Sequence, residues 1–300
     1  MSGFDYNVAF VRTIGWVTRT ELERLRNARI AIAGLGGVGG SHLLTLARLG
    51  VGHFHIADFD HFELHNMNRQ AGASMSRMGW PKVDALRDLA LDINPQLEIR
   101  SFPEGVHTGN LDAFLQGIDV YVDGLDFFAF QIRREVFAAC DRMGIPAVTV
   151  APLGFGAALL NFRPGGMSFD RYFDLRDDLS DTELSIRFMV GLAPAMLHTG
   201  YLVDPDAVDF EARRGPSTPM ACELCAGVMG TEVLKTLLGR GRSTWVPRGV
   251  HYDAYRQRLA RTWRPGGNRN PVQRLLIHFA RRRLARLQRR RATASPSGTG

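Results

Sequence analysis

The chain has 300 residues, of which 45% are hydrophobic and 22% charged, and its formal net charge is +7. This length can bury a substantial core, and no run of 18 apolar residues suggests a membrane span. With only three cysteines and no recognisable signal peptide, the composition argues against a disulfide-stabilised secreted scaffold and predicts a reducing, cytoplasmic location.

A glycine-rich turn follows the first predicted strand, within residues 30–40. Gly34 and Gly36 allow a tight turn, Gly37 lets the backbone approach a phosphate, and Gly39 lets the next helix pack close to the strand. The helix N-terminus offers free N–H groups and the positive end of its dipole to an anion. The turn by itself fits NAD as well as ATP.

The second predicted strand, residues 51–57, ends at Asp58 and Asp60. Asp58 comes 24 residues after Gly34, which is the usual position of a carboxylate that accepts ribose hydroxyls. We therefore expect both aspartates to line a nucleotide site at the carboxyl edge of a parallel sheet.

The following loop carries Asn66 and Arg69, and Lys82 comes directly after a proline. NAD brings its own reactive atom, whereas cleavage of a triphosphate requires cations beside the leaving oxygens. Arginine binds phosphate as a planar fork and lysine as a point charge. Lys82 is one of two lysines against 35 arginines, so we interpret it as a phosphate ligand; the alternative is an ordinary residue at a helix start.

A third buried strand, within residues 118–126, ends at Asp123 and Asp126. Carboxylates at the end of a strand can hold Mg²⁺ against a triphosphate. The alternative is that these aspartates only cap the helix that follows.

Together these motifs resemble the ThiF/MoeB/HesA superfamily of adenylyltransferases, which is related to the ubiquitin-activating E1 enzymes. The resemblance covers roughly residues 10–240 and includes Asn66-Met-Asn-Arg69-Gln70, Pro81-Lys82, Ile93-Asn94-Pro95 and Asp123-Gly-Leu-Asp126. It implies ATP- and Mg²⁺-dependent adenylation of a carboxylate, often the C-terminus of a ubiquitin-like or sulfur-carrier protein. It also implies residue roles: a backbone contact at Gly37, the ribose at Asp58, the triphosphate at Asn66, Arg69 and Lys82, and the magnesium at Asp126.

The resemblance further implies a homodimer, because dimeric members insert an N-terminal arginine into the partner's nucleotide site. Arg12 is the candidate, and the alternative is a surface arginine at a helix start. The family's usual asparagine after Asp126 is replaced by Phe127, which removes an amide that would orient the nucleotide or the metal.

Cysteine usage also departs from the family, because many members carry two Cys-x-x-Cys pairs that bind structural zinc. This chain has one such pair, Cys222 and Cys225, and a closed site needs four ligands, so we do not expect zinc. Thr218 and Pro219 predict the start of a helix, whose dipole would lower the pKa of nearby thiols. Cys222 is therefore a candidate acceptor of the activated acyl group; the alternative is a buried structural cysteine.

The rest of the chain contains a crossover region and a basic tail. Residues 148–162 resemble two strands with a bend at Gly154, and the polar stretch 167–184 is expected to be a long loop or lid within a crossover at about 165–218. Residues 254–300 hold 13 arginines and no acidic residue. Removing these charges from the total leaves −6, so the high basicity belongs to the tail.

Asn270 and Pro271 predict the start of an amphipathic basic helix. Such a helix suits an anionic membrane surface, an acidic partner or nucleic acid, and the alternative is a helix docked on the domain with solvated arginines.

The predicted fold is α/β, with a Rossmann-like, mostly parallel sheet and the nucleotide at the carboxyl ends of its strands. Residues 1–245 are assigned to the adenylation domain, 246–291 to a basic helical C-terminal appendage and 292–300 to a disordered tail. The predicted function is ATP-dependent adenylyl transfer, with transfer to a thiol as a later step. The alternatives are a tRNA-modifying dehydratase of the same superfamily, a non-catalytic ATP-binding scaffold and an NAD-dependent dehydrogenase.

Overall fold

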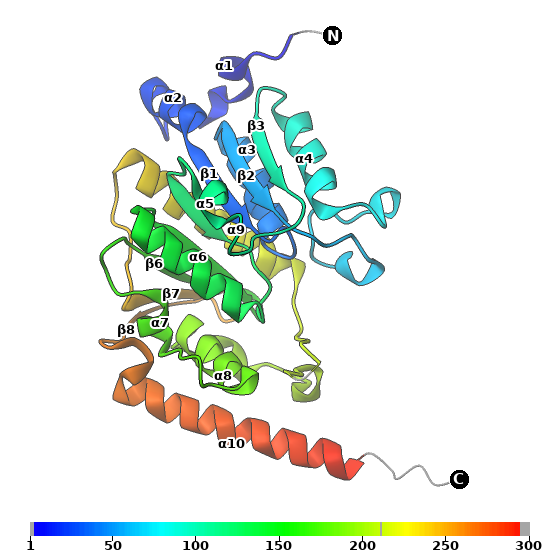
Figure 1. Ribbon diagram of the computed structural model, residues 1–300, viewed down its shortest axis with the longest axis vertical. Helices are drawn as coiled ribbons and strands as arrows, with labels where there is room; N and C mark the ends of the chain where they lie inside the picture. Colours follow the sequence, from blue (N-terminus) through cyan, green and yellow to red (C-terminus); the bar gives the residue numbers. More distant parts are fainter. Residues whose placement is uncertain (1–2, 211, 295–300) are drawn as a thin grey trace.

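An eight-stranded sheet forms the centre of the molecule, in the order β3-β2-β1-β4-β5-β6-β7-β8 (Figure 1). The computed structural model describes residues 3–210 and 212–294, with side chains described as far as residue 286. Five strands are parallel: β1 (Arg29–Ala33), β2 (His53–Ala57), β3 (Glu98–Phe102), β4 (Val120–Asp123) and β5 (Ala147–Leu153). The sheet continues antiparallel through β6 (Gly156–Phe162), β7 (Arg248–Asp253) and β8 (Arg258–Trp263).

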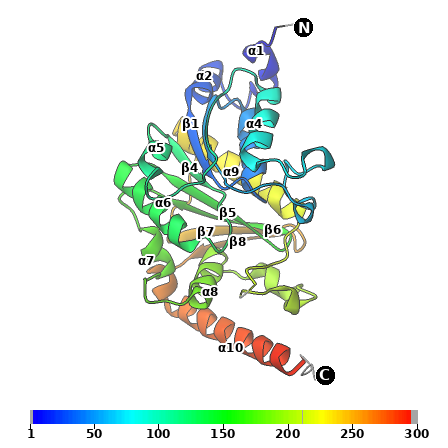
Figure 2. The same cartoon turned by 45° about the vertical axis from the view of Figure 1, so that its right-hand side comes forward.

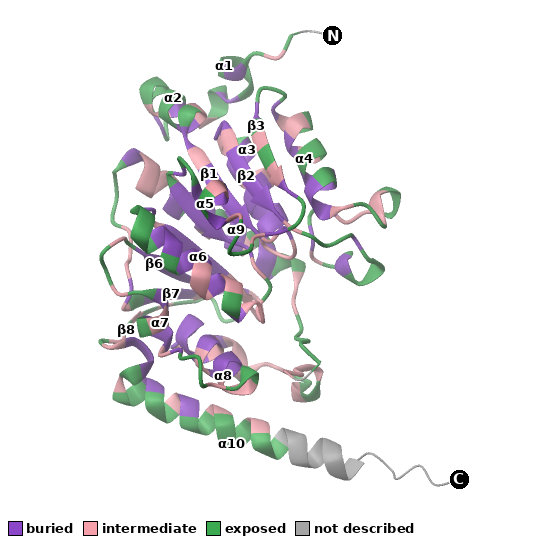
Figure 3. Cartoon of the chain, viewed as in Figure 1, coloured by how far each residue is buried: buried purple, intermediate pink, exposed green. Residues whose placement is uncertain are grey.

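Helices cover both faces of this sheet, which explains why its central strands are continuous apolar runs. One face packs against α3 (Gly39–Leu49), α4 (Lys82–Ile93) and α9 (Pro219–Leu238). The other packs against α5 (Leu111–Leu115), α6 (Phe130–Met143), α7 (Phe169–Phe173) and α8 (Asp181–Leu192). Figure 3 shows the buried residues concentrated between these layers. The predicted α/β class with a mostly parallel sheet is confirmed.

The N-terminal segment packs at the edge of the sheet where the parallel strands begin. It comprises α1 (Tyr6–Ala9), a 3₁₀ turn at Val11–Thr13 and α2 (Arg19–Asn27). The Tyr6 hydroxyl donates to the carbonyl of Gly50, at the C-terminal end of α3. This segment therefore lies at the opposite end of α3 from the glycine turn.

The crossover region is more ordered than the sequence indicated. The prediction of a loop over residues 167–184 was wrong in part, because α7 and the first turn of α8 lie within it. Phe169, Tyr172 and Phe173 of α7 are buried in the core. These three residues have the spacing of one helical face, but polar residues surround them in the sequence, so the stretch was predicted as a loop.

The C-terminal region differs from the predicted boundary after residue 245. Strands β7 and β8 extend the central sheet through backbone pairing, so residues 248–263 are continuous with the parallel part of the sheet. The predicted helix begins at Pro271 and runs as α10 (Pro271–Ala294), so residues 292–294 of the predicted disordered tail are helical and the rest of that tail lies outside the described residues.

Helix α10 docks along α8 at the edge of the molecule (Figures 1 and 2). Ile277 is buried against Ile186 and Val190, and Arg281 forms an ion pair with Glu183. The alternative prediction, a helix docked on the domain, therefore holds for the face of α10 that packs against α8. Within the described part of the chain, no helix combines the length and apolar character needed to cross a membrane.

Candidate nucleotide site

The glycine turn between β1 and α3 has the close packing that the sequence predicts. Gly34 adopts a φ of +82°, which is strained for residues with a side chain. A Cβ on Gly39 would lie only 1.8 Å from the Gly34 carbonyl oxygen, so a larger residue would push α3 away from the strand. These glycines leave a bare backbone at the start of α3, where N–H groups and the helix dipole favour an anion.

Asp58 ties the end of β2 to the glycine turn. One carboxylate oxygen accepts from the Leu35 N–H at 2.6 Å and the other from the Asp60 N–H at 2.8 Å. Burial raises the pKa of Asp58, although these two N–H groups and Lys82 act in the opposite direction. Its oxygens retain lone pairs that could accept ribose hydroxyls.

Lys82 lies at the start of α4 with only 5% of its surface exposed. Its Nζ donates to Asp60 at 2.9 Å, while the Asp60 side chain is about half exposed. The Lys82 ammonium is buried, but its partner carboxylate on Asp60 is exposed. A bound phosphate could therefore replace Asp60 as the partner of Lys82, and the protein would lose only one solvent-accessible ion pair.

Arg69 lies against the glycine turn, although it is far from it in sequence. A Cβ on Gly37 would be 3.8 Å from its Nε. The guanidinium donates to the His65 carbonyl at 3.0 Å and to the Asn68 side chain at 2.9 Å, which hold it in place. Asn66 is buried and accepts from the Glu63 N–H at 2.9 Å, so it shapes the loop that carries Arg69.

Gln70 also reaches this turn, and the sequence analysis gave it no role of its own. A Cβ on Gly36 would lie 3.8 Å from Gln70 Nε2. The side chain is 7% exposed, and its Oε1 has no hydrogen-bond partner within the described structure. A buried amide oxygen without a partner beside the glycine turn suits a bound polar ligand. Its position directly after Arg69 was the only signal in the sequence.

Asp123 faces the protein interior rather than the site edge. It forms an ion pair with Arg133 at 2.9 Å in which both side chains are 2% exposed, and it accepts from the Thr149 hydroxyl at 2.9 Å. Arg133 also donates to the carbonyls of Leu125 and Asp126. The sequence predicts Asp123 as a cofactor ligand, whereas in the structure its carboxylate holds Arg133, which shapes the loop after β4.

Asp126 lies on that loop with an exposed side chain, and its Oδ1 accepts from the Phe128 N–H at 2.9 Å. One carboxylate oxygen of Asp126 therefore closes the turn before α6, whereas the alternative that it caps this helix is wrong, because α6 starts after Ala129 without a side-chain cap. Phe127, in place of the family's asparagine, packs against Phe188 and Phe210 with ring centroids 5.2 and 6.2 Å away.

Cys222 lies directly beneath the glycine turn, since a Cβ on Gly37 would be 3.5 Å from its Sγ. Thr218 and Pro219 begin α9 as predicted. The expected lowering of the thiol pKa is wrong, however, because Cys222 is fully buried and burial raises its pKa despite the opposing effects of Ser217 and Arg69.

Cys225 is also fully buried, and burial raises its pKa well above the usual value for a thiol. Among the described residues, no group of three or more His, Cys, Asp or Glu side chains could hold a metal ion.

Arg12 is exposed in the 3₁₀ turn after α1, at the end of α3 that lies away from the glycine turn. Apart from Asp123, whose carboxylate faces the interior, the structure thus brings the other predicted residues around one sheet edge, and it leaves Arg12 outside that edge. Within one subunit Arg12 is not part of the site.

Three comparisons place the fold and sequence among known proteins. The chain is 30% identical to MoeZ of Mycobacterium tuberculosis, a probable adenylyltransferase/sulfurtransferase, over 77% of this chain and 53% of MoeZ. It is 33% identical to the tRNA threonylcarbamoyladenosine dehydratase of Bacillus subtilis over 43% of this chain and 50% of that protein. The structure is similar to E. coli MccB, with a TM-score of 0.67 and 15% identity over 90% of this chain and 75% of MccB.

The chain spans about half the length of the curated relatives it matches. The sequence model of the ThiF family matches residues 10–274, which include the glycine turn, Asp58, Arg69, Lys82 and Asp126. The match confirms the resemblance inferred from these motifs, and the chain therefore belongs to the ThiF family.

Proposed function

We propose that this protein is an ATP- and Mg²⁺-dependent adenylyltransferase that activates a substrate carboxylate. The convergence of Arg69, Gln70 and buried Lys82 with the bare glycine backbone supports this function best. A nicotinamide cofactor would use the glycine turn and Asp58 but would leave these cations without a role.

In the proposed reaction, a carboxylate oxygen of the substrate bonds to the α-phosphorus of ATP. The bond from that phosphorus to the bridging oxygen breaks, and pyrophosphate leaves with its electron pair. Because a carboxylate is already a nucleophile, no protein base is needed, and the chain contributes positioning and charge. Arg69 and Lys82 would neutralise charge on the triphosphate, and Asp58 would position the ribose.

Asp126 is our proposed magnesium ligand, because its exposed carboxylate provides the hard oxygen donor that Mg²⁺ prefers. Magnesium would supply additional neutralisation of the phosphate oxygens. Asp123 is left out of this proposal, since its carboxylate already has Arg133 and Thr149 as partners.

The substrate we propose is the C-terminus of a small ubiquitin-like or sulfur-carrier protein. The names of relatives such as the ThiS adenylyltransferase of E. coli support this substrate class. Transfer of the acyl group to a thiol would follow; for Cys222 to serve as that thiol, its side chain would first have to become accessible. The reaction would take place in the cytoplasm, where ATP is available.

ATP–pyrophosphate exchange with magnesium, with and without a carrier protein, tests this function. Lys82→Met should lower exchange by about 10²–10³-fold, as removal of one preorganised electrostatic donor does in other enzymes. Lys235→Met is the matched control, because it changes the only other lysine and should leave exchange unchanged. Full exchange by Lys82→Met would refute the role of Lys82. ATP binding without exchange by any substrate would favour the scaffold alternative.

A tRNA-modifying dehydratase is the second candidate, favoured by the similarity to the B. subtilis tRNA enzyme. Such an enzyme would use ATP on a carboxylate carried by tRNA. Stimulation of ATP turnover by tRNA but not by carrier proteins would support it, with binding that weakens as salt is raised.

We also propose a homodimer in which Arg12 acts in the partner's site. Arg12 lies away from the glycine turn of its own subunit, and exposed Val8, Val11 and Trp16 surround it in sequence. Mixing Arg12→Ala with Lys82→Met subunits distinguishes the arrangements. If Arg12 acts across the interface, each mixed dimer regains one intact site. If it acts within its own subunit, no activity returns, and if it has no role, Arg12→Ala alone keeps full activity.

The outer face of α10 is our proposed contact with an anionic surface. Val272, Leu275 and Phe279 are each at least 50% exposed, and Arg282 and Arg286 continue the same face one to two turns later. Apolar and cationic residues on one face suit an anionic lipid surface. Binding to phosphatidylglycerol vesicles but not to phosphatidylcholine vesicles, lost in Phe279→Ser, would support it.

A further inference from the structure

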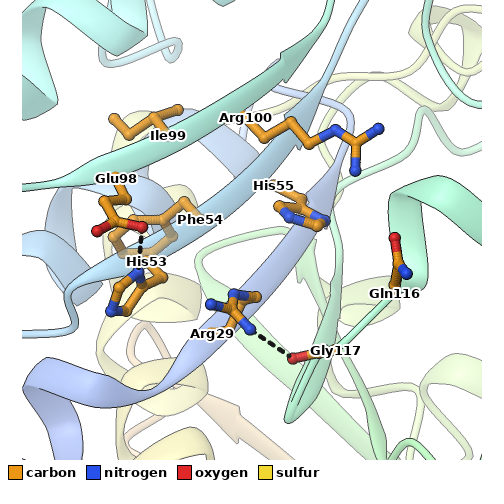
Figure 4. A pocket seen from close by; sticks show the side chains of 9 residues that line it. All are labelled: Arg29, His53, Phe54, His55, Glu98, Ile99, Arg100, Gln116 and Gly117. Atoms are coloured by element: carbon orange, nitrogen blue, oxygen red, sulfur yellow. Dashed lines mark hydrogen bonds and ion pairs between the residues drawn. The ribbon is translucent and has the colours of Figure 1, made fainter.

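A cavity of about 650 Å³ lies away from the nucleotide site, over the beginning of β1, β2 and β3 (Figure 4). Arg29 is the first residue of β1, whereas the glycine turn follows the last residue of that strand. His55 and Arg100 line the cavity on the sheet face covered by α5 and α6. The short helix α5 leaves this corner of the sheet open.

Positive charge dominates the cavity. The guanidinium groups of Arg29 and Arg100 donate to carbonyls of Gly117 and Ala113, at 3.4 and 3.3 Å. Among the described side chains, neither guanidinium forms an ion pair with a carboxylate. Glu98 is the one carboxylate that lines the cavity in the described structure, and it contacts His53 at 3.1 Å.

His55 lies between these two arginines (Figure 4). Its ring is fixed by a hydrogen bond of 2.7 Å from Nδ1 to the buried carbonyl of Phe114. Because that carbonyl only accepts, Nδ1 carries the proton. Burial lowers the pKa of His55, and the charges of Arg100 and Arg29 lower it further.

Two guanidinium groups without a carboxylate partner among the described side chains line one cavity, and both charges would attract a bound anion. Guanidinium groups match the geometry of phosphate oxygens, with which they form charge-assisted hydrogen bonds. The volume lies in the range of small-molecule sites and leaves room for a group attached to the phosphate. We propose that this cavity binds a phosphorylated small molecule, with Arg29 and Arg100 as the phosphate ligands.

Nuclear magnetic resonance of the histidine rings tests this site without ATP, so the result does not depend on adenylation. Inorganic phosphate and ribose 5-phosphate are titrated separately near neutral pH, with chloride at equal ionic strength as the reference. The His55 signal is assigned by its absence from His55→Gln. We expect a saturable shift of that signal with one or both phosphates and none with chloride.

Arg29→Gln and Arg100→Gln should each weaken binding by about tenfold or more, which corresponds to the loss of one charge-assisted hydrogen bond. Arg87→Gln is the matched control, because it removes the same charge from an exposed position on α4. Saturation by ribose 5-phosphate alone would identify an organic phosphate as the ligand, and saturation by both would place recognition in the phosphate itself. Equal responses to phosphate and chloride, or equal affinities in all three variants, would overturn the proposal.

Discussion

The buried pair of Asp123 and Arg133 makes a prediction that separates structural from metal-binding aspartates. In Asp123→Asn the guanidinium loses its charged partner while both side chains remain 2% exposed. Removal of one member of a buried ion pair typically costs about 3–5 kcal/mol. The amide can still accept from Thr149, so we expect a loss of about 3 kcal/mol in the free energy of unfolding.

The assay is urea denaturation at neutral pH, with Asp126→Asn as the matched control. Asp126 is exposed, and asparagine can still accept from the Phe128 N–H, so its stability should change by less than about 0.5 kcal/mol. Magnesium-dependent ATP–pyrophosphate exchange, measured per folded molecule, should fall more in Asp126→Asn than in Asp123→Asn, because Asp126→Asn removes the proposed metal ligand.

A loss of less than about 1 kcal/mol in Asp123→Asn would refute the structural role, because a buried guanidinium without a charged partner should cost more than that. Arg133→Met combined with Asp123→Leu provides a further check. If the missing partner is the cause, the double variant should be more stable than Asp123→Asn, since neither charge then remains unpaired.

Three other predictions test the site and its surroundings. Gly39→Ala should lower the free energy of unfolding, measured by urea denaturation, by about 3 kcal/mol, because the new Cβ would meet a backbone carbonyl. Gly37→Ala should lower it by less than about 1 kcal/mol, because its Cβ would make ordinary contacts. Cys222 should react with iodoacetamide far more slowly in the native than in the unfolded protein; equal rates by mass spectrometry would contradict its burial. Burial acts to raise the pKa of Glu183, but its ion pairs, including that with Arg281, hold it below 4.5. The stability lost in Glu183→Gln should therefore be greatest above about pH 5 and shrink as pH falls below 4, and a pH-independent difference would be contrary evidence.

The grouping of most candidate site residues at one sheet edge could be predicted because these residues follow buried strands at fixed offsets. The glycine turn, Asp58 and Asp126 each come directly after a strand, and parallel strands bring their carboxyl ends to one edge. Burial of a charged group cannot be read in this way. Asp123 also ends a strand, but its partner Arg133 lies ten residues later on a helix, and only the packing of α6 brings the two together.

The tail shows the same limit at the level of elements. Its arginines suggested a separate appendage, yet residues 248–253 alternate between buried and more exposed positions along β7, and β7 and β8 extend the sheet. This alternation covers only a few residues and lies beside a long, arginine-rich helix. The composition of the whole tail therefore predicted an appendage instead of a strand. The helix start at Pro271 was predictable, since a cap residue followed by proline is a local signal.

The replacement of asparagine by Phe127 has a structural counterpart that composition could not reveal. The Phe127 ring packs on the Phe188 ring of α8. The guanidinium of Arg133 lies 4.8 Å from the centre of the Phe188 ring. The loop that carries Asp126 is therefore held by two contacts. Phe127 packs against the crossover region, and the buried Asp123–Arg133 ion pair fixes the backbone of the loop. An asparagine would orient a ligand directly, whereas this arrangement fixes Asp126 through the scaffold. The position of the proposed metal ligand should consequently depend on the packing of α8.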